Sequence, residues 1–262
     1  MMKFFKAIHM DRKVFGGILA TVLVFAGAAM LVPQIAPAVA RVSATAGRKL
    51  PIYCVQTDEP KVSVSFDAAW GADDTDELLR ILDENDVKAT FFLCGYWVEK
   101  YPEEVKKIAE AGHDLGNHSA THPHMSQLSS EQIAQELQKC HQEVKEVTGV
   151  EMELFRPPFG EYDNHVVDTA KENGYYTIQW DVDSLDWKEQ GADAEINQVL
   201  NHKHLGSGSI ILFHNDAKYT PQVLDTILKG LKEKGYEIVP VSELILRDNF
   251  EMDHEGRQIQ KG

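Results

Sequence analysis

The chain has 262 residues, a formal net charge of −15, and 43% hydrophobic and 26% charged residues. Its composition is that of an ordinary globular protein, and its length suits one large domain with an extension. The acidic balance argues against nucleic acid and against an anionic membrane surface as the main partner, because both require a basic face.

Residues 1–40 have the layout of an export segment. Lysines and arginines lie among the first 13 residues, an uncharged stretch covers residues 14–32, and Ala38-Val39-Ala40 resembles a cleavage site. The uncharged stretch is long enough to span a bilayer, so the segment is a cleaved signal peptide or an uncleaved membrane anchor. Its basic flank predicts that the remainder lies outside the cytoplasm.

Strand and helix patterns alternate after a polar linker, which we predict at residues 41–60. The period-two alternation of residues 61–66 predicts a strand. A long helix is predicted at about residues 129–148, because Ser129 suits its N-cap and Gly149 its end. Further strands are predicted at 89–93, near Leu154, and at 176–180, 209–213 and 236–239, and further helices at 74–85, 102–111, 166–173 and 221–234.

This alternation predicts an α/β fold in which a parallel sheet lies inside a layer of helices. Seven or eight units suggest closure into a distorted (β/α)7–8 barrel over residues 61–246, preceded by the N-terminal apolar helix. Functional side chains should then follow the strands, at the carboxyl rim of the barrel. Residues 247–262 are polar without periodicity, and we expect a frayed tail.

Two histidines, His118 and His122, lie four residues apart after Gly116-Asn117. On a helical turn this spacing directs both imidazoles to the same side, where they can share a metal ion. Such a pair is more often solvated or capping than metal-binding. Its interpretation therefore depends on the motifs around it.

Polar or ionisable residues follow four of the predicted strands and the stretch Asp114-Leu115-Gly116, which counts as a fifth strand end. Each has a simpler explanation taken singly, as a helix cap, a surface ion pair or a turn. Their coincidence at one rim favours a functional site. They are Asp67, the pair His118 and His122, Arg156, the group Asp181, Asp183 and Asp186, and His214.

Five segments in this order resemble the motifs of the polysaccharide deacetylases, which carry the NodB homology domain and form carbohydrate esterase family 4. The resemblance covers about residues 55–246. It implies a NodB-type barrel and an exported hydrolase that removes N-acetyl groups from peptidoglycan or a related wall or spore glycan. The segments are Ser65-Phe66-Asp67, Gly116-Asn117-His118-Ser119-(x)2-His122-Pro123, Arg156-Pro157-Pro158-Phe159-Gly160, Asp183-(x)2-Asp186-Trp187 and Leu212-Phe213-His214.

A narrower similarity concerns the first motif. Phe66-Asp67-Ala68-Ala69-Trp70-Gly71, with the lead-in at residues 48–53, is similar to the sporulation-type, PdaB-like branch of the family. This similarity implies a location at the forespore or spore envelope.

The resemblance implies a metal and a base. His118 and His122 would hold a divalent ion, zinc with cobalt or nickel as alternatives, which lowers the pKa of a bound water and polarises the acetyl carbonyl. Asp67 would be the general base, and Arg156 would hold it in place and keep it ionised.

It also implies an acid and a substrate pocket. His214 would protonate the departing amine, with Asp186 orienting its imidazole. The backbone N–H of Phe159 would help to form the oxyanion hole, while Trp187 and Leu212 would line the acetyl pocket.

The chain departs from the family at Ala68, where the family has a second aspartate that completes a metal triad. Alanine coordinates nothing, and catalytic zinc normally has three protein ligands. Three outcomes remain open. Asp67, Asp73 or Asp74 is recruited as the third ligand, the metal is held loosely with extra waters, or the chain is a catalytically silent glycan-binding or structural protein. Retention of both a base and an acid favours the enzyme.

The three cysteines, Cys54, Cys94 and Cys140, are widely spaced without a CxxC pair. This spacing indicates neither a zinc–cysteine site nor a disulfide framework. Cys94 follows an apolar run and is expected to be core packing, and we assign no chemistry to any of the three.

Overall fold

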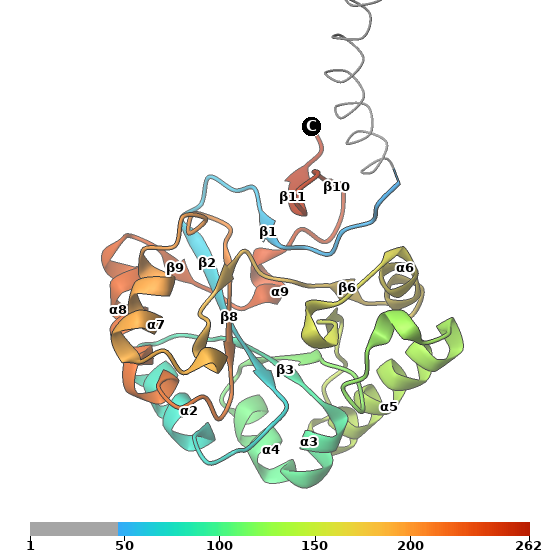
Figure 1. The fold of residues 1–262 in the computed structure, drawn as a ribbon, viewed down its shortest axis with the longest axis horizontal. Helices are drawn as coiled ribbons and strands as arrows, with labels where there is room; N and C mark the ends of the chain where they lie inside the picture. Colours follow the sequence, from blue (N-terminus) through green and yellow to red (C-terminus); the bar gives the residue numbers. More distant parts are fainter. Residues whose placement is uncertain (1–46) are drawn as a thin grey trace, which may run out of the picture. The chain divides into compact units, whose positions relative to one another are not determined.

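The computed structural model describes residues 47–262 (Figure 1). The predicted signal peptide or anchor lies outside the described residues. Within 47–262, no helix has the length and apolar character that crossing a bilayer requires.

The sheet is built from parallel strands in the order β6-β5-β4-β3-β2-β8-β7, and β9 also pairs with β2. The sheet curls into a barrel (Figure 1). Its two outermost strands, β6 and β7, do not pair with each other, so the barrel stays open along one seam. This confirms the predicted distorted α/β barrel. The strands are β2 (Lys61–Ala68), β3 (Thr90–Leu93), β4 (Asp114–Asn117), β5 (Leu154–Phe155), β6 (Tyr176–Thr177), β7 (Val182–Asp183), β8 (Ile210–His214) and β9 (Glu237–Ile238).

Helices lie around the outside of this sheet (Figure 1). Ser129 and Gln132 form a capping box at the start of α5, and Gly149 ends it in the left-handed conformation, as the sequence predicted. The short helices α3, α7 and α9 were not predicted. The α-helices are α2 (Thr75–Glu84), α3 (Gly95–Lys100), α4 (Pro102–Glu110), α5 (Ser130–Thr148), α6 (Asn164–Glu172), α7 (Ala192–Leu200), α8 (Thr220–Glu233) and α9 (Val241–Leu244), and short 3-10 turns are η1 (Met125–Gln127), η2 (Pro158–Gly160) and η3 (Asp186–Lys188).

The alternation along β2 separates two environments. Phe66 packs against Phe91 of β3, with ring centroids 4.9 Å apart, in the cluster between the sheet and the helices. Ser65 and Asp67, on the opposite side of the strand, are equally buried but contact the guanidinium of Arg156. The period-two pattern thus places apolar side chains under the helices and polar ones inside the barrel.

The predicted linker is wrong from residue 49 onward, because Lys49 and the residues after it belong to the barrel unit. Ile52 bridges to Ile178, and the N–H of Val55 donates to the carbonyl of Gly208 (3.0 Å). This strap therefore covers the barrel beside β6 and β8. Its buried apolar residues are few and lie within a polar stretch, so periodicity did not show them.

The predicted frayed tail is also wrong. β10 (Phe250–Met252) and β11 (Arg257–Gln260) form an antiparallel hairpin, and β11 pairs in parallel with β1 (Cys54–Val55) of the strap. The side-chain amide of Gln258 is buried and bonds to both the N–H and the carbonyl of Leu246 (2.8 and 2.9 Å). The tail is ordered by a partner about 200 residues away in sequence, which no local pattern reveals.

Candidate active site

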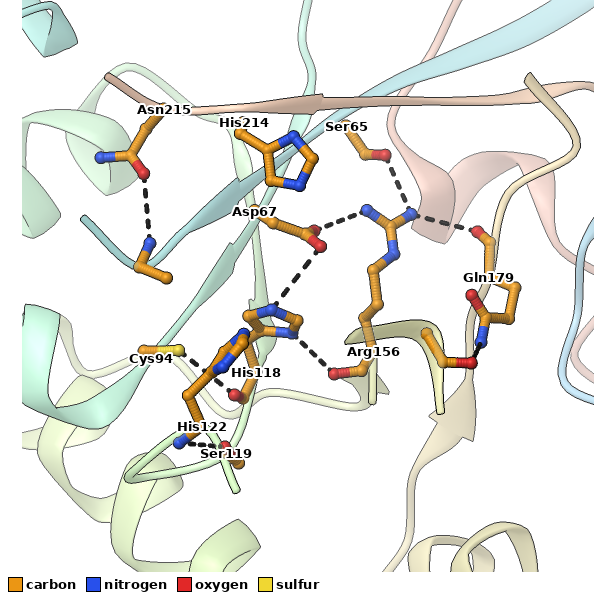
Figure 2. A network of polar contacts seen from close by, with 12 residues as sticks. Ser65, Asp67, Cys94, His118, Ser119, His122, Arg156, Gln179, His214 and Asn215 are labelled. Carbon is orange, nitrogen blue, oxygen red and sulfur yellow. Dashed lines mark hydrogen bonds and ion pairs between the residues drawn. The ribbon is translucent and has the colours of Figure 1, made fainter. Parts of the chain in front are cut away.

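The carboxyl ends of the central strands bring the predicted site residues together. The register pairs Asp67 of β2 with His214 of β8. His118 directly follows β4, and Arg156 directly follows β5. Figure 2 shows Asp67 between His214 and Arg156, with His118 turned toward it.

Asp67 and Arg156 form a buried ion pair. Nη1 of Arg156 donates to Oδ1 of Asp67 (2.7 Å), while Nη2 donates to Ser65 Oγ (2.9 Å) and to the carbonyl of Gln179 (3.1 Å). The two side chains are 6% and 0% exposed, respectively. Burial alone would raise the pKa of Asp67, but the charge of Arg156 holds it below its ordinary value. Asp67 is therefore ionised at neutral pH, as a general base must be.

His118 and His122 lie side by side, with ring centroids 5.0 Å apart, but not on a helical turn. The segment is a loop in which Ser119 (φ 68°) and His122 (φ 56°) have left-handed backbone. The side chain of Asn117 accepts from the N–H of Ser119, and Ser119 Oγ accepts from the N–H of His122, both at 2.9 Å. The predicted proximity is present, and the helical explanation for it is wrong.

The chemistry of the two imidazoles fits a divalent metal. Nδ1 of His118 lies 2.7 Å from the carbonyl oxygen of Arg156, which only accepts, so Nδ1 carries the proton and Nε2 keeps a lone pair. Burial lowers the pKa of His118, and it lowers that of His122 to about 4. Both rings are therefore neutral at physiological pH, which is the form that binds metals.

His214 has the contacts expected of a general acid. Its Nδ1 lies 2.8 Å from Oδ1 of Asp186, whose Oδ2 also accepts from the N–H of His214 (2.6 Å). Burial alone would lower the pKa of His214, but the hydrogen bond and charge of Asp186 raise it above its ordinary value. The protonated imidazole is thereby favoured.

The predicted substrate residues differ in exposure. Phe159 and Trp187 are more than half exposed, while Leu212 is buried within β8. Phe159 has a left-handed backbone (φ 59°), and its ring lies 4.5 Å from that of His122. The backbone N–H of Trp187 donates to Oδ1 of Asp186 (2.7 Å). The exposed indole is therefore next to the residue that binds His214.

Sequence reasoning missed Trp70 as a residue of the site. Its ring lies 5.4 Å from the imidazole of His214, and the side chain is 54% exposed. Asn215 fixes the turn that carries it, because the side chain accepts from the N–H of Ala69 (3.1 Å) and donates to the carbonyl of Gly71. The available signal was a large aromatic residue three positions after Asp67.

A third possible metal donor was also missed. Among the described residues, one group of three or more histidine, cysteine or acidic side chains has ligand atoms all within 4.8 Å of one another, and it contains Cys94, His118 and His122. Asp73 and Asp74 are outside it, and Asp74 accepts instead from the N–H of Asp216 (2.8 Å). The structure does not support the recruitment of either aspartate. Cys94 is buried in the core, as predicted, and also belongs to this donor group.

Comparison with known proteins identifies the family. A family model described as polysaccharide deacetylase matches residues 55–178. A peptidoglycan-N-acetylglucosamine deacetylase of Bacillus cereus is 36% identical over 200 residues, covering 73% of this chain and 91% of that protein. The chain belongs to the polysaccharide deacetylase family. The deacetylases among its relatives are hydrolases of carbon–nitrogen bonds other than peptide bonds.

Two other relatives are similar over about three quarters of this chain or more. The uncharacterised protein YlxY of Bacillus subtilis is 37% identical over 195 residues, which cover 74% of this chain and 60% of that protein's length. The solved structure of a family pseudoenzyme from Bacillus anthracis is 34% identical with a TM-score of 0.71, and the match covers 80% of this chain and 70% of that chain. A mutant of this pseudoenzyme is described as having restored enzymatic activity. The comparisons do not identify the sporulation-type branch.

Proposed function

We propose that this chain hydrolyses N-acetyl groups of peptidoglycan or a related wall glycan, outside the cytoplasm and with a divalent metal. The observation that carries the proposal is the pairing of an ionised Asp67, held by Arg156, with a His214 whose protonated form is favoured by Asp186. Glycan binding alone needs neither a base nor an acid. Their opposed pKa shifts are the arrangement that hydrolysis of an inert amide requires.

The chain's own residues divide the proton transfers between them. Oδ1 of Asp67 is occupied by Arg156, so Oδ2 accepts the proton of the attacking water. His214 donates through Nε2 to the departing amine nitrogen, because Nδ1 is held by Asp186. The N–H of Phe159 stabilises the negative oxygen of the tetrahedral intermediate. When bound by His118 and His122, a divalent ion would activate the water and polarise the acetyl carbonyl.

Exposed aromatic side chains support a glycan as the substrate. Three aromatic side chains beside the site are more than half exposed. Trp70 is next to His214, Phe159 next to His122, and Trp187 next to Asp186. Aromatic rings stack on the apolar faces of sugars. The curated deacetylases among the relatives act on N-acetylglucosamine or on N-acetylmuramic acid residues of peptidoglycan, and both sugars are candidates here.

Acetate release tests the proposal directly. The full chain, incubated with N-acetylglucosamine oligomers or with peptidoglycan, should release acetate, lose this activity with a chelator and regain it with added zinc or cobalt. Acetate is measured with a coupled enzymatic assay. No release with any metal, while glycan binding persists, would rule out the enzyme.

That outcome would favour the second candidate, a catalytically silent glycan-binding protein of the envelope. Ala68 in place of the family's second aspartate supports this candidate, and so does the similarity to a pseudoenzyme. The Ala68→Asp variant separates the two in the same assay, because only a silent parent would gain activity from none.

The location outside the cytoplasm is part of the proposal, supported by the basic flank and the uncharged residues 14–32. The segment is either cleaved or retained as an anchor, and a spore-envelope location is the narrower form of the proposal. Fractionation of the producing cells measures the location, and mass spectrometry of the mature N-terminus shows whether the segment is cleaved.

Replacing Asp186 with asparagine should change the pH dependence of kcat/KM. Activity requires ionised Asp67, whose pKa is lowered, and protonated His214, whose pKa is raised, so it falls as the pH rises through the pKa of His214. Without the charge of Asp186 that pKa decreases, and the alkaline limb moves to lower pH. Asp183→Asn is the control, because Asp183 is a smaller contributor to the same shift. An unmoved limb in Asp186→Asn would contradict the assigned acid.

A further inference from the structure

The thiol of Cys94 lies within a compact group of metal donors. Its Sγ and one ring nitrogen each of His118 and His122 are all within 4.8 Å of one another. Cys94 directly follows β3 and His118 directly follows β4, so neighbouring parallel strands carry the two donors to the same rim. Figure 2 shows the sulfur beside the two imidazoles.

Cys94 is also the neighbour of the position that lacks a ligand. The backbone N–H of Cys94 donates to the carbonyl of Ala68 (3.1 Å), across the end of the β2–β3 pair. Ala68 offers no donor atom, and two imidazoles leave the site one protein ligand short. The strand beside Ala68 provides a thiol instead.

We infer that Cys94 is the third protein ligand of the metal site, with its thiolate in place of the carboxylate that is absent at Ala68. The inference rests on the proposed function in one respect, that the metal held by Cys94 serves the proposed deacetylation. A sulfur and two ring nitrogens leave a fourth tetrahedral position open, as in catalytic zinc sites.

The present contacts of Cys94 do not prevent this role. Its Sγ donates to the carbonyl of His118 (3.3 Å), a weak hydrogen bond that would be lost when a metal ion displaces the thiol proton. Nε2 of His118 lies 3.6 Å from Asp67 Oδ2, too far for a hydrogen bond, so its lone pair remains available.

A thiolate ligand changes the expected metal preference. Thiolate and imidazole favour zinc, whereas magnesium and manganese prefer oxygen ligands. The chain should therefore bind zinc and cobalt far more tightly than magnesium or manganese.

Cobalt spectroscopy tests the ligand without relying on activity. The full chain with Co²⁺ alone should show the near-ultraviolet absorption of a thiolate–cobalt bond. In Cys94→Ser this absorption should disappear, and the affinity for Zn²⁺, measured against a chelating dye, should fall by about 100-fold, since even second-shell changes cost up to this much. Circular dichroism checks that the variant is folded.

Cys140 provides the matched control. It is also wholly buried, and its Sγ donates to the carbonyl of Leu93 (3.1 Å), but it lies outside the donor group. Cys140→Ser should retain the absorption. The double variant Cys54→Ser/Cys140→Ser leaves Cys94 as the single cysteine of the chain, so the result does not depend on a folded Cys94 variant.

The possible results are distinct. A chain that binds no Co²⁺, that binds it without the thiolate absorption, or that keeps the absorption in Cys94→Ser overturns the inference. Thiolate absorption without acetate release keeps the ligand and rejects the proposed function. Acetate release without the absorption rejects the ligand and keeps the function.

Discussion

Replacing Asp67 with asparagine should lower kcat/KM for acetate release by about 10²- to 10⁴-fold, the usual contribution of a general base. Asparagine keeps the shape of the side chain and its capacity to accept from Nη1 of Arg156. It cannot take a proton from water, so the loss should fall on kcat more than on KM. Single-turnover and steady-state acetate assays on one glycan oligomer measure both constants.

The matched control for this variant is Asp73→Asn. Asp73 undergoes the same chemical change six residues away, is exposed and lies outside the donor group. Its activity should equal that of the parent. If Asp67→Asn retained parental activity as well, another group would have to be the base.

Replacing Arg156 with methionine should lower the free energy of unfolding by about 3–5 kcal/mol, because it leaves the buried carboxylate of Asp67 without its partner. Adding Asp67→Asn to this variant should recover a large part of the loss, since the uncompensated charge is then removed. Urea denaturation of the four proteins of this double-mutant cycle measures the coupling between the two side chains.

Arg80→Met is the control for the arginine change. Arg80 also pairs with carboxylates, Glu77 and Glu84, but its side chain is 50% exposed. Exposed pairs contribute about 0–1 kcal/mol, so this variant should be close to the parent. Equal losses in Arg80→Met and Arg156→Met would mean that the burial of the Asp67 pair is not what makes it important.

The strand ends of the candidate site could be predicted from the sequence because they depend on local patterns. The alternation in β2 fixes which side chains face the barrel interior, and parallel strands carry their next residues to one rim. Asp67, Arg156 and His214 therefore meet as expected. The ends of α5 were equally predictable, since a capping serine and a left-handed glycine act within one turn.

Other features depend on partners distant in sequence and could not be predicted. The strap at β1 and the hairpin of β10 and β11 order each other although about 200 residues separate them in sequence. The four-residue spacing of His118 and His122 suggested a helix. The segment is a loop instead, in which the side chains of Asn117 and Ser119 accept hydrogen bonds from backbone N–H groups. The apolar run before Cys94 correctly predicted a buried residue, but the two histidines beside it come from the next strand end and depend on tertiary contacts.

Ser119, His122 and Phe159 have left-handed backbone, which serves the site but lowers the stability of the fold. Such conformations cost about 1–3 kcal/mol each in residues with a side chain, and all three belong to the loops that line the site. Glycine would relieve that cost at any of them and remove the side chain that the site uses. A descendant released from selection for catalysis would thus become more stable by relaxing these loops. The loops that serve catalysis would in that case be the positions at which an inactive relative gains stability.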